Sequence, residues 1–342
     1  MMRKFLVTGG AGFIGSAFVR LLLDASPNAL VTNLDLLTYA GNLDNCDGLD
    51  HQRHRFIRGD IADPNTVRQA MGDDCEVVIN FAAESHVDRS ISDAAAFLRT
   101  NIIGTQVLLD ASRERGVKRF VHISTDEVMG SLPEDGNGCF TETSPFAPNS
   151  PYAASKAAAE HLVRAARHTF GLDTIITRCG NNYGPRQFPE KFLPLIIANS
   201  LNDRQIPLYG DGKNVRDWIY VDDHCRAILL AIEKGRSGAV YNIGARNERR
   251  NADVIKSVLD LLGKPHSLIQ PVKDRPGHDR RYAIDPTLIE TELGWRPVES
   301  WESGLRKTIE WYRDNTRWLE RARSGAYRDY YRSQYGSEVG TI

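Results

Sequence analysis

The sequence predicts an α/β fold in which a doubly wound parallel sheet carries a smaller mixed α/β lobe. Short apolar runs alternate with helical patterns through the first half of the chain, which is typical of such a sheet. A glycine-rich turn follows the first run, and acidic residues follow several others. With 342 residues, the chain is long enough for one large domain and a smaller lobe. The predicted buried strands are residues 5–7, 30–34, 56–61, 77–83, 120–123 and 174–178.

The turn after the first strand predicts a dinucleotide site. Glycine stands at positions 9, 12 and 15, and an apolar helical pattern then covers residues 17–23. Glycine allows a tight turn, close approach of the backbone to a pyrophosphate, and close packing of helix on strand. The glycine spacing alone is a weak signal, but the strand before it and the helix after it favour a Rossmann-type sheet. Gly9, Gly12 and Gly15 are therefore expected to contact a coenzyme.

Acidic residues after the next two strands indicate which coenzyme binds. The second strand leads into Asp35, twenty residues beyond the last glycine of the turn. A carboxylate there suits the ribose hydroxyls of NAD and repels the additional phosphate of NADP. Leu36 and Leu37 supply no arginine to reverse that preference. The alternative for Asp35 is a plain turn residue. The third strand brings Asp60 to where it could meet the adenine.

Two adjacent carboxylates follow the fifth strand. The apolar run leads directly into Ser124, Thr125, Asp126 and Glu127. Ligands bind at the carboxyl ends of strands in an open parallel sheet. Neighbouring acids can also be pushed to different pKa values, which leaves one as an acid and the other as a base. An isolated Asp-Glu pair would more simply be a solvated turn.

A tyrosine and a lysine one helical turn apart favour chemistry at that strand end. Ser150 and Pro151 predict the start of a helix that runs to residue 170 and stops at Gly171. Tyr152 and Lys156 are four apart and share one face. An ammonium near a phenol is expected to lower the phenol pKa from about 10, making a base. The Tyr-x-x-x-Lys spacing recurs by chance on many helices, so the prediction depends on the glycine turn and the Ser/Thr pair.

Composition and charge exclude several classes of partner. The 43 basic and 44 acidic residues balance, so neither a nucleic acid nor a charged membrane is expected as a partner. The five cysteines are odd in number and lack metal-ligand spacing, which predicts reduced thiols, no metal site and a cytoplasmic protein. No apolar run has the length of a signal-peptide core or a membrane span.

These motifs together resemble the extended short-chain dehydrogenase/reductase family. In that family a Ser/Thr, a Tyr and a Lys remove a hydroxyl proton while hydride passes to the nicotinamide. The resemblance implies that Thr125 orients the sugar hydroxyl and that Tyr152 is the base. It implies that Lys156 lowers the Tyr152 pKa and holds the nicotinamide ribose.

The Asp126-Glu127 pair narrows the resemblance to the nucleoside-diphosphate-glucose 4,6-dehydratases, most closely the enzymes that act on dTDP-glucose. Residues 82–90 and 181–185 also match. The implied reaction oxidises C4, eliminates water across C5 and C6, and returns hydride to C6, giving dTDP-4-keto-6-deoxyglucose and regenerated NAD, which stays bound. Asp126 would protonate the C6 hydroxyl and Glu127 would take the C5 proton. The alternatives are a UDP-sugar 4,6-dehydratase, a nucleotide-sugar 4-epimerase or decarboxylase, and a non-catalytic nucleotide-sugar sensor.

The resemblance also implies two sets of binding residues. His86 is as readily a structural histidine as a functional one, and neighbouring Ser85 is the residue expected at both ligands. The residues expected to bind NAD are Gly9, Gly12, Phe13, Ile14, Gly15, Asp35, Thr38, Asp60, Ile61, Ala82, Ala83, Ser85, Thr100, Tyr152, Lys156 and Asn182. The residues expected to bind the nucleotide sugar are Ser85, Thr125, Asn181, Lys191, Phe192, Pro207, Tyr209, Arg216, Asn251, Arg275 and His278.

The two lobes are expected to interleave along the chain. The sequence predicts an NAD-binding domain at 1–185 and 216–247, a nucleotide-sugar-binding domain at 186–215 and 248–330, and a polar tail at 331–342. Residues 218–223 and 240–244 are expected to return to the large domain, and the tryptophan-rich region from 295 to 312 predicts a packed amphipathic helix. The resemblance implies a homodimer that packs helices 96–115 and 151–170 of each subunit together.

Three positions depart from the usual family sequence. Met129 stands where the family usually has tyrosine, Gly180 where it has serine, and Leu36 where it has lysine. None of the three is expected to be an acid or a base, so the reaction class is unaffected. A flexible thioether at position 129 is expected to change packing or polarity at the sugar.

Overall fold

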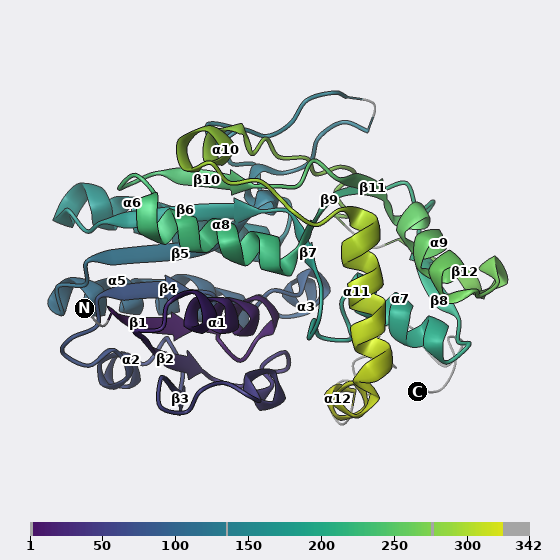
Figure 1. Ribbon diagram of the computed structural model, residues 1–342. Helices are drawn as coiled ribbons and strands as arrows, with labels where there is room; N and C mark the ends of the chain where they lie inside the picture. Colours follow the sequence, from purple (N-terminus) through teal and green to yellow (C-terminus); the bar gives the residue numbers. More distant parts are fainter. Residues whose placement is uncertain (1–2, 135, 275–276, 324–342) are drawn as a thin grey trace.

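The computed structural model describes residues 3–134, 136–274 and 277–323, and it has two lobes side by side (Figure 1). The expected polar tail and Arg275 lie outside the described residues. The larger lobe is built on a seven-stranded sheet in the order β10-β6-β5-β4-β1-β2-β3, in which every neighbouring pair is parallel. Its strands are β1 (Arg3–Thr8), β2 (Ala29–Asp35), β3 (His54–Arg58), β4 (Val77–Asn80), β5 (Arg119–Thr125), β6 (Thr174–Cys179) and β10 (Val240–Ile243).

Helices cover both faces of this sheet, as predicted for a doubly wound fold. Alternate residues of β1 enter different cores: Phe5 and Val7 pack with α1 and α8, and Leu6 packs with α2, α5 and α6. Since successive side chains of a strand point to opposite faces, these helix groups lie on opposite sides. The helices are α1 (Phe13–Ala25), α2 (Pro64–Met71), α5 (Thr105–Glu114), α6 (Pro151–Phe170) and α8 (Val221–Lys234).

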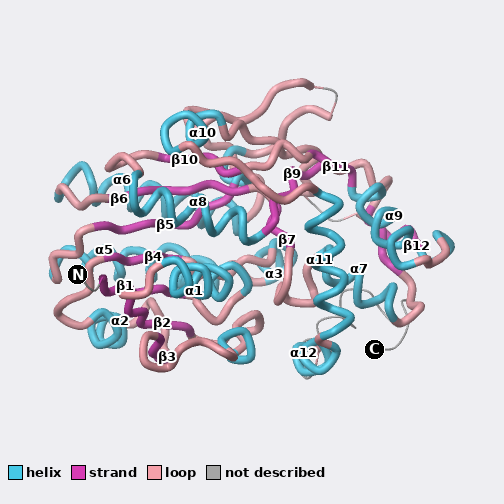
Figure 2. The backbone as a smooth tube through the Cα atoms, viewed as in Figure 1, coloured by secondary structure: helices cyan, strands magenta, loops and turns pink. Residues whose placement is uncertain are grey.

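The smaller lobe is a mixed α/β layer at the carboxyl ends of the large sheet (Figure 2). It holds a three-stranded sheet, β11-β9-β7, and a two-stranded parallel sheet, β12-β8. The strands are β7 (Asn181–Tyr183), β8 (Ile206–Tyr209), β9 (Val215–Tyr220), β11 (Glu248–Arg250) and β12 (Ile269–Val272). The helices of the later chain are α7 (Phe192–Leu201), α9 (Asn251–Leu262), α10 (Thr287–Leu293), α11 (Trp301–Asp314) and α12 (Thr316–Ala322).

The tryptophan-rich region forms the core of the smaller lobe, as its apolar spacing predicts. Trp301, Leu305, Ile309 and Tyr312 are buried along one face of α11, against α7 and α9. Trp295 precedes this helix and packs in the core of the larger lobe instead. The region therefore joins the two lobes.

The segment at 218–223 was expected to return to the large domain, and the structure divides it. Strand β9 pairs with β7 and β11 in the smaller sheet, whereas α8 packs on the large sheet. The chain rejoins the large sheet at β10. The boundaries of the two predicted domains stay a prediction.

The helix expected at 96–115 is confirmed as one unbroken helical run over residues 95–114, but its middle part is π-helical rather than regular α-helix. The segment is divided into α4 (Ala95–Phe97), a π-helical stretch (Leu98–Gly104) and α5, and Gly116 follows with φ +62°. Inside the π stretch the Asn101 side chain accepts from Glu84 N at 2.9 Å and donates to Ser155 Oγ at 2.8 Å. Side-chain bonds to other elements accompany the widened turn, which is a geometry often found at functional sites.

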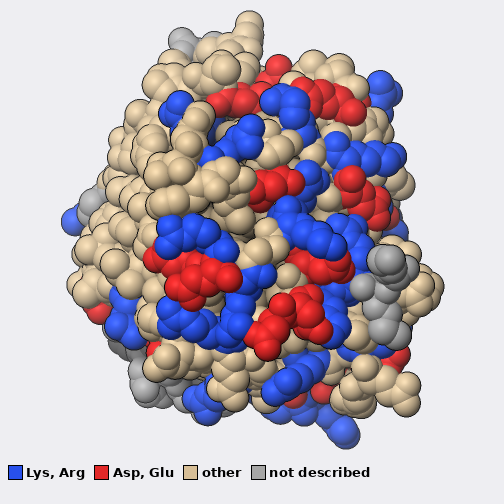
Figure 3. All heavy atoms as spheres, turned by 90° about the vertical axis from the view of Figure 1, so that its left-hand side faces the viewer, with Lys and Arg blue, Asp and Glu red and all other residues tan. Residues whose placement is uncertain are grey.

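Charged side chains of both signs alternate on the face that carries the amino ends of the parallel strands (Figure 3). Ion pairs there include Arg68 with Glu114 and Arg119 with Asp173. Interspersed signs create no extended field of one sign on this face. Each helix within residues 3–134, 136–274 and 277–323 is too short or too polar to cross a membrane.

Candidate active site

The strand order places a crevice at the carboxyl ends of β1 and β4. The chain builds β1, β2 and β3 outward in one direction and then crosses to β4 on the other side of β1. Ligands of doubly wound sheets bind at such a reversal. Gly9 has φ +71°, and a Cβ there would lie 2.6 Å from Ala82 N. Glycine is therefore required where the turn passes the end of β4.

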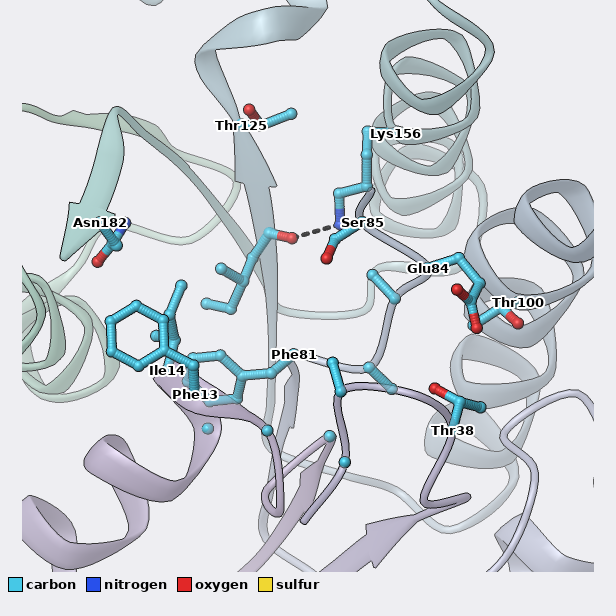
Figure 4. A pocket seen from close by; sticks show the side chains of 18 of the residues that line it. Phe13, Ile14, Thr38, Phe81, Glu84, Ser85, Thr100, Thr125, Lys156 and Asn182 are labelled. Carbon is cyan, nitrogen blue, oxygen red and sulfur yellow. Dashed lines mark hydrogen bonds between the residues drawn. The ribbon is translucent and has the colours of Figure 1, made fainter. Parts of the chain in front are cut away.

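A cavity of about 320 Å³ opens at this crevice, and every residue expected to bind NAD lines it. Figure 4 shows Phe13 and Ile14 at one end, beside the glycine turn, and Thr38, Glu84 and Thr100 gathered at the other. A Cβ on Gly15 would lie 2.2 Å from Gly9 O, so the helix start can approach the turn only without a side chain. The glycine turn leaves room for a pyrophosphate close to its backbone, and Asp35 suits a ribose without a phosphate, so the cavity fits NAD.

Asp35 ends β2 and holds the glycine turn in place. Its Oδ2 accepts from Ala11 N at 3.0 Å and its Oδ1 accepts from Leu37 N at 2.8 Å. Burial raises the pKa of the carboxyl, and the two backbone donors oppose that rise. The sequence predicts only that Asp35 contacts the ribose of the coenzyme. The structure shows that its carboxylate also holds the backbone of the glycine turn and of the loop after β2.

Substitution of Asp35 by serine is expected to weaken NAD binding by about tenfold or more and to narrow the preference for NAD over NADP, since hydrogen bonds to charged groups contribute about 1.5–3 kcal/mol. Calorimetric titration of coenzyme-depleted protein with each coenzyme measures both affinities. Asp63→Ser is the control, because Asp63 lines neither cavity and serine can also cap α2. An unchanged NAD affinity in Asp35→Ser would exclude a coenzyme role for this carboxylate.

The five predicted catalytic residues meet at the end of β5. Thr125 is the last residue of the strand, and its Oγ1 accepts from Glu127 N at 3.3 Å, which starts a short 3₁₀ turn (Asp126–Met129). Helix α6 begins as expected, with Ser150 Oγ accepting from Ala153 N at 3.1 Å. All five line the first cavity: Thr125, Asp126, Glu127, Tyr152 and Lys156.

Lys156 lies across the end of β5. Its Nζ donates to Ile123 O at 2.5 Å, the hydrogen bond drawn in Figure 4. Burial lowers the pKa of the ammonium to about 8, and the Glu160 carboxylate opposes that shift. The backbone carbonyl thereby fixes the lysine on the cavity wall.

The pKa of Tyr152 differs from the expected direction. Burial raises it well above 10, and the negative charge of Glu127 adds to the rise. The bond with Thr125 lowers it, but by less. The prediction of a lowered pKa was therefore wrong for the protein alone, because burial cannot be read from the Tyr-Lys spacing. The positive nicotinamide ring of NAD would favour the phenolate.

Asp126 is buried and its pKa is raised well above the ordinary value. Burial is the largest cause, the charge of Glu127 adds to it, and Arg216 opposes it. Thr125 Oγ1 donates to Asp126 Oδ1 at 3.3 Å. Glu127 lines the first cavity and also a second cavity, which is described below. The pair therefore offers an acid whose raised pKa favours the protonated form, beside a second carboxyl group that reaches both cavities.

A second cavity of about 190 Å³ lies between the lobes and shares a wall with the first. Both cavities are lined by Ser85, Glu127, Asn181, Asn182, Gln187 and Lys191. The other residues expected at the nucleotide sugar also line the second cavity, except that Thr125 lines the first alone and Arg275 lies outside the described residues. Those that line the second cavity alone are Phe192, Pro207, Tyr209, Arg216, Asn251 and His278.

Tyr282 is a residue of this cavity that the sequence analysis missed. Its ring centre lies 4.2 Å from the Arg216 guanidinium carbon, and its hydroxyl donates to Asp279 Oδ2 at 2.5 Å. Arg216 Nη2 donates to Asp279 O at 2.9 Å, so one residue anchors both side chains. The tyrosine follows the matched motif by only four residues, but no spacing rule links it to Arg216.

The three departures from the family sequence have different surroundings. Met129 lines neither cavity: it is buried with Phe140 and Ala157, and its Sδ accepts from Arg178 Nη1 at 3.6 Å. Its expected effect on the sugar is therefore corrected to one on packing behind the site. Gly180 lines the first cavity, and a Cβ there would lie 2.7 Å from Asp217 O. Leu36 lines the same cavity at its exposed rim.

Comparison with known proteins places the chain in a family. The model of the GDP-mannose 4,6 dehydratase family matches residues 6–308. The dTDP-glucose 4,6-dehydratase of Shigella flexneri is 48% identical, over 97% of this chain and 99% of its own. The crystal structure of the dTDP-glucose 4,6-dehydratase DesIV from Streptomyces venezuelae, with NAD bound, is 50% identical with a TM-score of 0.90 and covers 93% of this chain and 99% of its own.

More distant solved structures share the fold. The UDP-glucose 4-epimerase of Thermus thermophilus, in complex with NAD, is 34% identical with a TM-score of 0.84 over 91% of this chain and 99% of its own. Dehydratases are thus closer to this chain than this epimerase is. The acid pair after β5, the tyrosine–lysine helix and the near full-length identity agree, and the chain belongs to the dTDP-glucose 4,6-dehydratase family.

Proposed function

We propose that the protein is an NAD-dependent lyase that converts dTDP-glucose into dTDP-4-keto-6-deoxyglucose. The observation that carries this proposal is the Asp126-Glu127 pair at the border of the two cavities, with Asp126 buried and its pKa raised. An enzyme that only oxidises and reduces C4 needs no second acid and base. An elimination across C5 and C6 needs both.

The redox half uses the residues around Lys156. Thr125 orients the C4 hydroxyl, and Tyr152 takes its proton as hydride leaves C4. NAD supplies the hydride acceptor and, once reduced, the donor that restores it at C6. Lys156 stabilises the phenolate by its charge and is kept in place by Ile123 O.

The elimination half uses the acid pair. A ketone at C4 acidifies the C5 proton, which the Glu127 carboxylate removes. Asp126 donates its proton to the C6 hydroxyl, which departs as water. When hydride arrives at C6, a proton returns to C5, so the sugar loses one water overall and carries no net oxidation. The raised pKa of Asp126 favours its protonated form, which is the form that can donate.

Cationic side chains of the second cavity suit a nucleoside diphosphate. Arg216 is buried and its orientation is set by Val215 O and Asp279 O at 2.7 and 2.9 Å. Lys191 lies at the border of both cavities and donates to Ser85 O at 2.8 Å. Arginine pairs with phosphate through two parallel hydrogen bonds, whereas lysine acts as a point charge.

Incubation with dTDP-glucose in D₂O tests the reaction class. The proposal predicts a product one water lighter than the substrate, with one solvent deuterium at C5, which NMR and mass spectrometry detect. A 4-epimerase would give an isomer of unchanged mass with no solvent deuterium. Parallel incubation with UDP-glucose tests the nucleotide, and faster turnover of UDP-glucose would contradict the dTDP assignment.

We further propose that the protein is a homodimer that works in the cytoplasm. Leu98 and Ile103 in the π stretch and Phe170 at the end of α6 are exposed, and these elements pack together. Apolar side chains on such a surface suit a subunit interface. All five cysteines are free thiols, in keeping with a reducing compartment.

Substitution of Ile103 by glutamate is expected to convert the dimer into monomers, because an ionised carboxylate would be buried at the interface. Sedimentation velocity gives the state of assembly. Leu261→Glu, at an exposed leucine of α9, is the matched control and should remain dimeric. A monomeric parent protein, or a dimeric Ile103→Glu variant, would contradict the proposed interface.

A further inference from the structure

Three segments that are far apart in the sequence meet beside the two cavities. They are the loop after β2 (residues 36–41), helix α3 (Val87–Ser92) and the stretch before α7 (residues 187–191). Figure 1 shows α3 between the carboxyl end of the large sheet and the smaller lobe. Four side chains connect these segments, and we call the set the latch: Tyr39, Arg89, Phe188 and Glu190.

Arg89 is at the centre of the latch. Its guanidinium carbon lies 4.2 Å from the ring centre of Tyr39, and its Nη2 donates to Glu190 Oε2 at 2.8 Å. The rings of Tyr39 and Phe188 meet edge-on with centres 5.8 Å apart. One arginine of the large lobe therefore holds the β2 loop on one side and the stretch before α7 on the other.

The ion pair at the centre of the latch joins a buried carboxylate to a partly buried guanidinium, since the Arg89 side chain is 26% exposed. The Glu190 side chain is 1% exposed. Burial raises the pKa of Glu190, whereas the bond from Arg89 and the charge of Lys191 lower it. His86 Nε2 lies 3.7 Å from Glu190 Oε1. Loss of the Arg89 contact would leave the buried Glu190 carboxylate without this partner, so the pair resists separation.

Two residues with positive φ accompany the held segments, Leu37 in the β2 loop and Arg186 directly before the stretch 187–191. Leu37 has φ +58° and Arg186 has φ +69°, which is the left-handed region that non-glycine side chains rarely adopt. Such residues persist where surrounding contacts hold them, and they gather at ligand clamps. The contacts of Tyr39 and Phe188, two residues along in each case, provide that support.

The held segments are walls of the cavity that fits NAD. Residues next to Tyr39 line it from the β2 loop, and Gln187, Phe188 and Lys191 line it from the opposite side. Arg89 and Tyr39 line neither cavity, so they act behind the walls. Separation of the two segments would open the coenzyme cavity.

We infer that the latch keeps NAD in its cavity between the two hydride transfers. The inference rests on the proposed function, in which the hydride removed from C4 must return to C6 of the same molecule. Loss of NADH midway would leave an unreduced intermediate and an enzyme unable to finish the cycle. Arg89, Tyr39 and Glu190 are positioning residues in this account, since they hold the walls and touch no reacting atom.

The rate at which bound coenzyme leaves the protein tests the latch directly. Protein loaded with radiolabelled NAD is mixed with excess unlabelled NAD, and retained label is followed by filtration. Arg89→Met and Glu190→Gln should each release NAD about tenfold faster or more. The double variant should add little to either single change, because both remove one interaction. Tyr39→Leu, on the loop, should also accelerate release without removing a buried charge.

Arg113→Met is the matched control. Arg113 also lies over an aromatic ring, Phe170 at 4.3 Å, and pairs with a carboxylate, Asp110, but it lies away from both cavities. Its NAD release rate should equal that of the parent. Circular dichroism identifies any variant that fails to fold, and Tyr39→Leu then decides the result. Release rates within about twofold of the parent in the folded latch variants would overturn the inference.

The two proposals fail in different ways. If the parent dehydrates dTDP-glucose and the latch variants hold NAD as firmly as the parent does, the latch is wrong and the proposed function stands. If the variants lose NAD rapidly but the parent dehydrates no nucleotide sugar, the proposed function is wrong, and the latch retains NAD but has no role between two hydride transfers.

Discussion

Replacement of Glu127 by glutamine is expected to slow dehydration by about 10²–10⁴-fold, the usual contribution of a positioned acid or base. Glutamine keeps the size of the side chain but cannot accept the C5 proton. Hydride transfer from C4 uses Tyr152 and Lys156, so the first half of the reaction should continue. NADH absorbance should therefore rise and persist in a single turnover with dTDP-glucose, whereas in the parent it decays.

Asp126→Asn separates the acid from the base. It removes the proton donor for the C6 hydroxyl, so dehydration should fall by a similar factor. In the parent, the rate should fall as the pH rises through the raised pKa of Asp126, because only the protonated form can donate. Dehydration by Glu127→Gln at the parent rate would contradict the role of Glu127, and an unchanged rate in Asp126→Asn would contradict that of Asp126.

Replacement of Arg178 by methionine is expected to destabilise the fold by about 3–5 kcal/mol, the usual effect of removing one partner of a buried ion pair. Arg178 Nε and Nη2 donate to the Glu160 carboxylate at 2.8–3.1 Å, and both side chains are almost fully buried. The pair joins β6 to α6, the helix that carries Tyr152 and Lys156. Urea denaturation of the NAD-saturated protein measures the loss of unfolding free energy.

A second substitution and a surface pair provide the controls. Adding Glu160→Leu to Arg178→Met should restore part of the lost stability, because it removes the uncompensated carboxylate. Arg68→Met breaks an ion pair with Glu114 that is exposed on both sides, and it should leave the denaturation midpoint nearly unchanged. Equal losses of unfolding free energy in Arg68→Met and Arg178→Met would show that burial of the Arg178–Glu160 pair does not determine its contribution to stability.

The features that the sequence predicts correctly are those that depend on residues close together in the chain. The glycine turn, the acid after β2 and the tyrosine–lysine helix each depend on residues close together in the chain, and each signal has its own geometric cause. Asp35 and the start of α6 therefore lie where the sequence places them. The alternation of strands and helices likewise predicts a parallel sheet, because a chain that joins two parallel strands must cross over between them, usually through a helix.

Features that depend on burial or distant contacts could not be predicted. The pKa of Tyr152 rises because the phenol is buried near Glu127, and the spacing to Lys156 carries no information about burial. Asn101 of the π stretch bonds to α6 and to the backbone of Glu84, and neither contact has a signal in the sequence. Arg89 and Glu190 are 101 residues apart, and no motif pairs them. Such contacts exist only after segments far apart in the sequence have packed together.

Transfer of a C4 deuterium tests the central claim most directly. With dTDP-glucose labelled at C4, the proposed mechanism predicts that the label reaches C6 of the same product molecule, since one bound NAD removes and returns the hydride. A mixture of labelled and unlabelled substrate should give no exchange of label between molecules. Label retained at C4, as after epimerisation, or lost to solvent or to other molecules, would contradict the account.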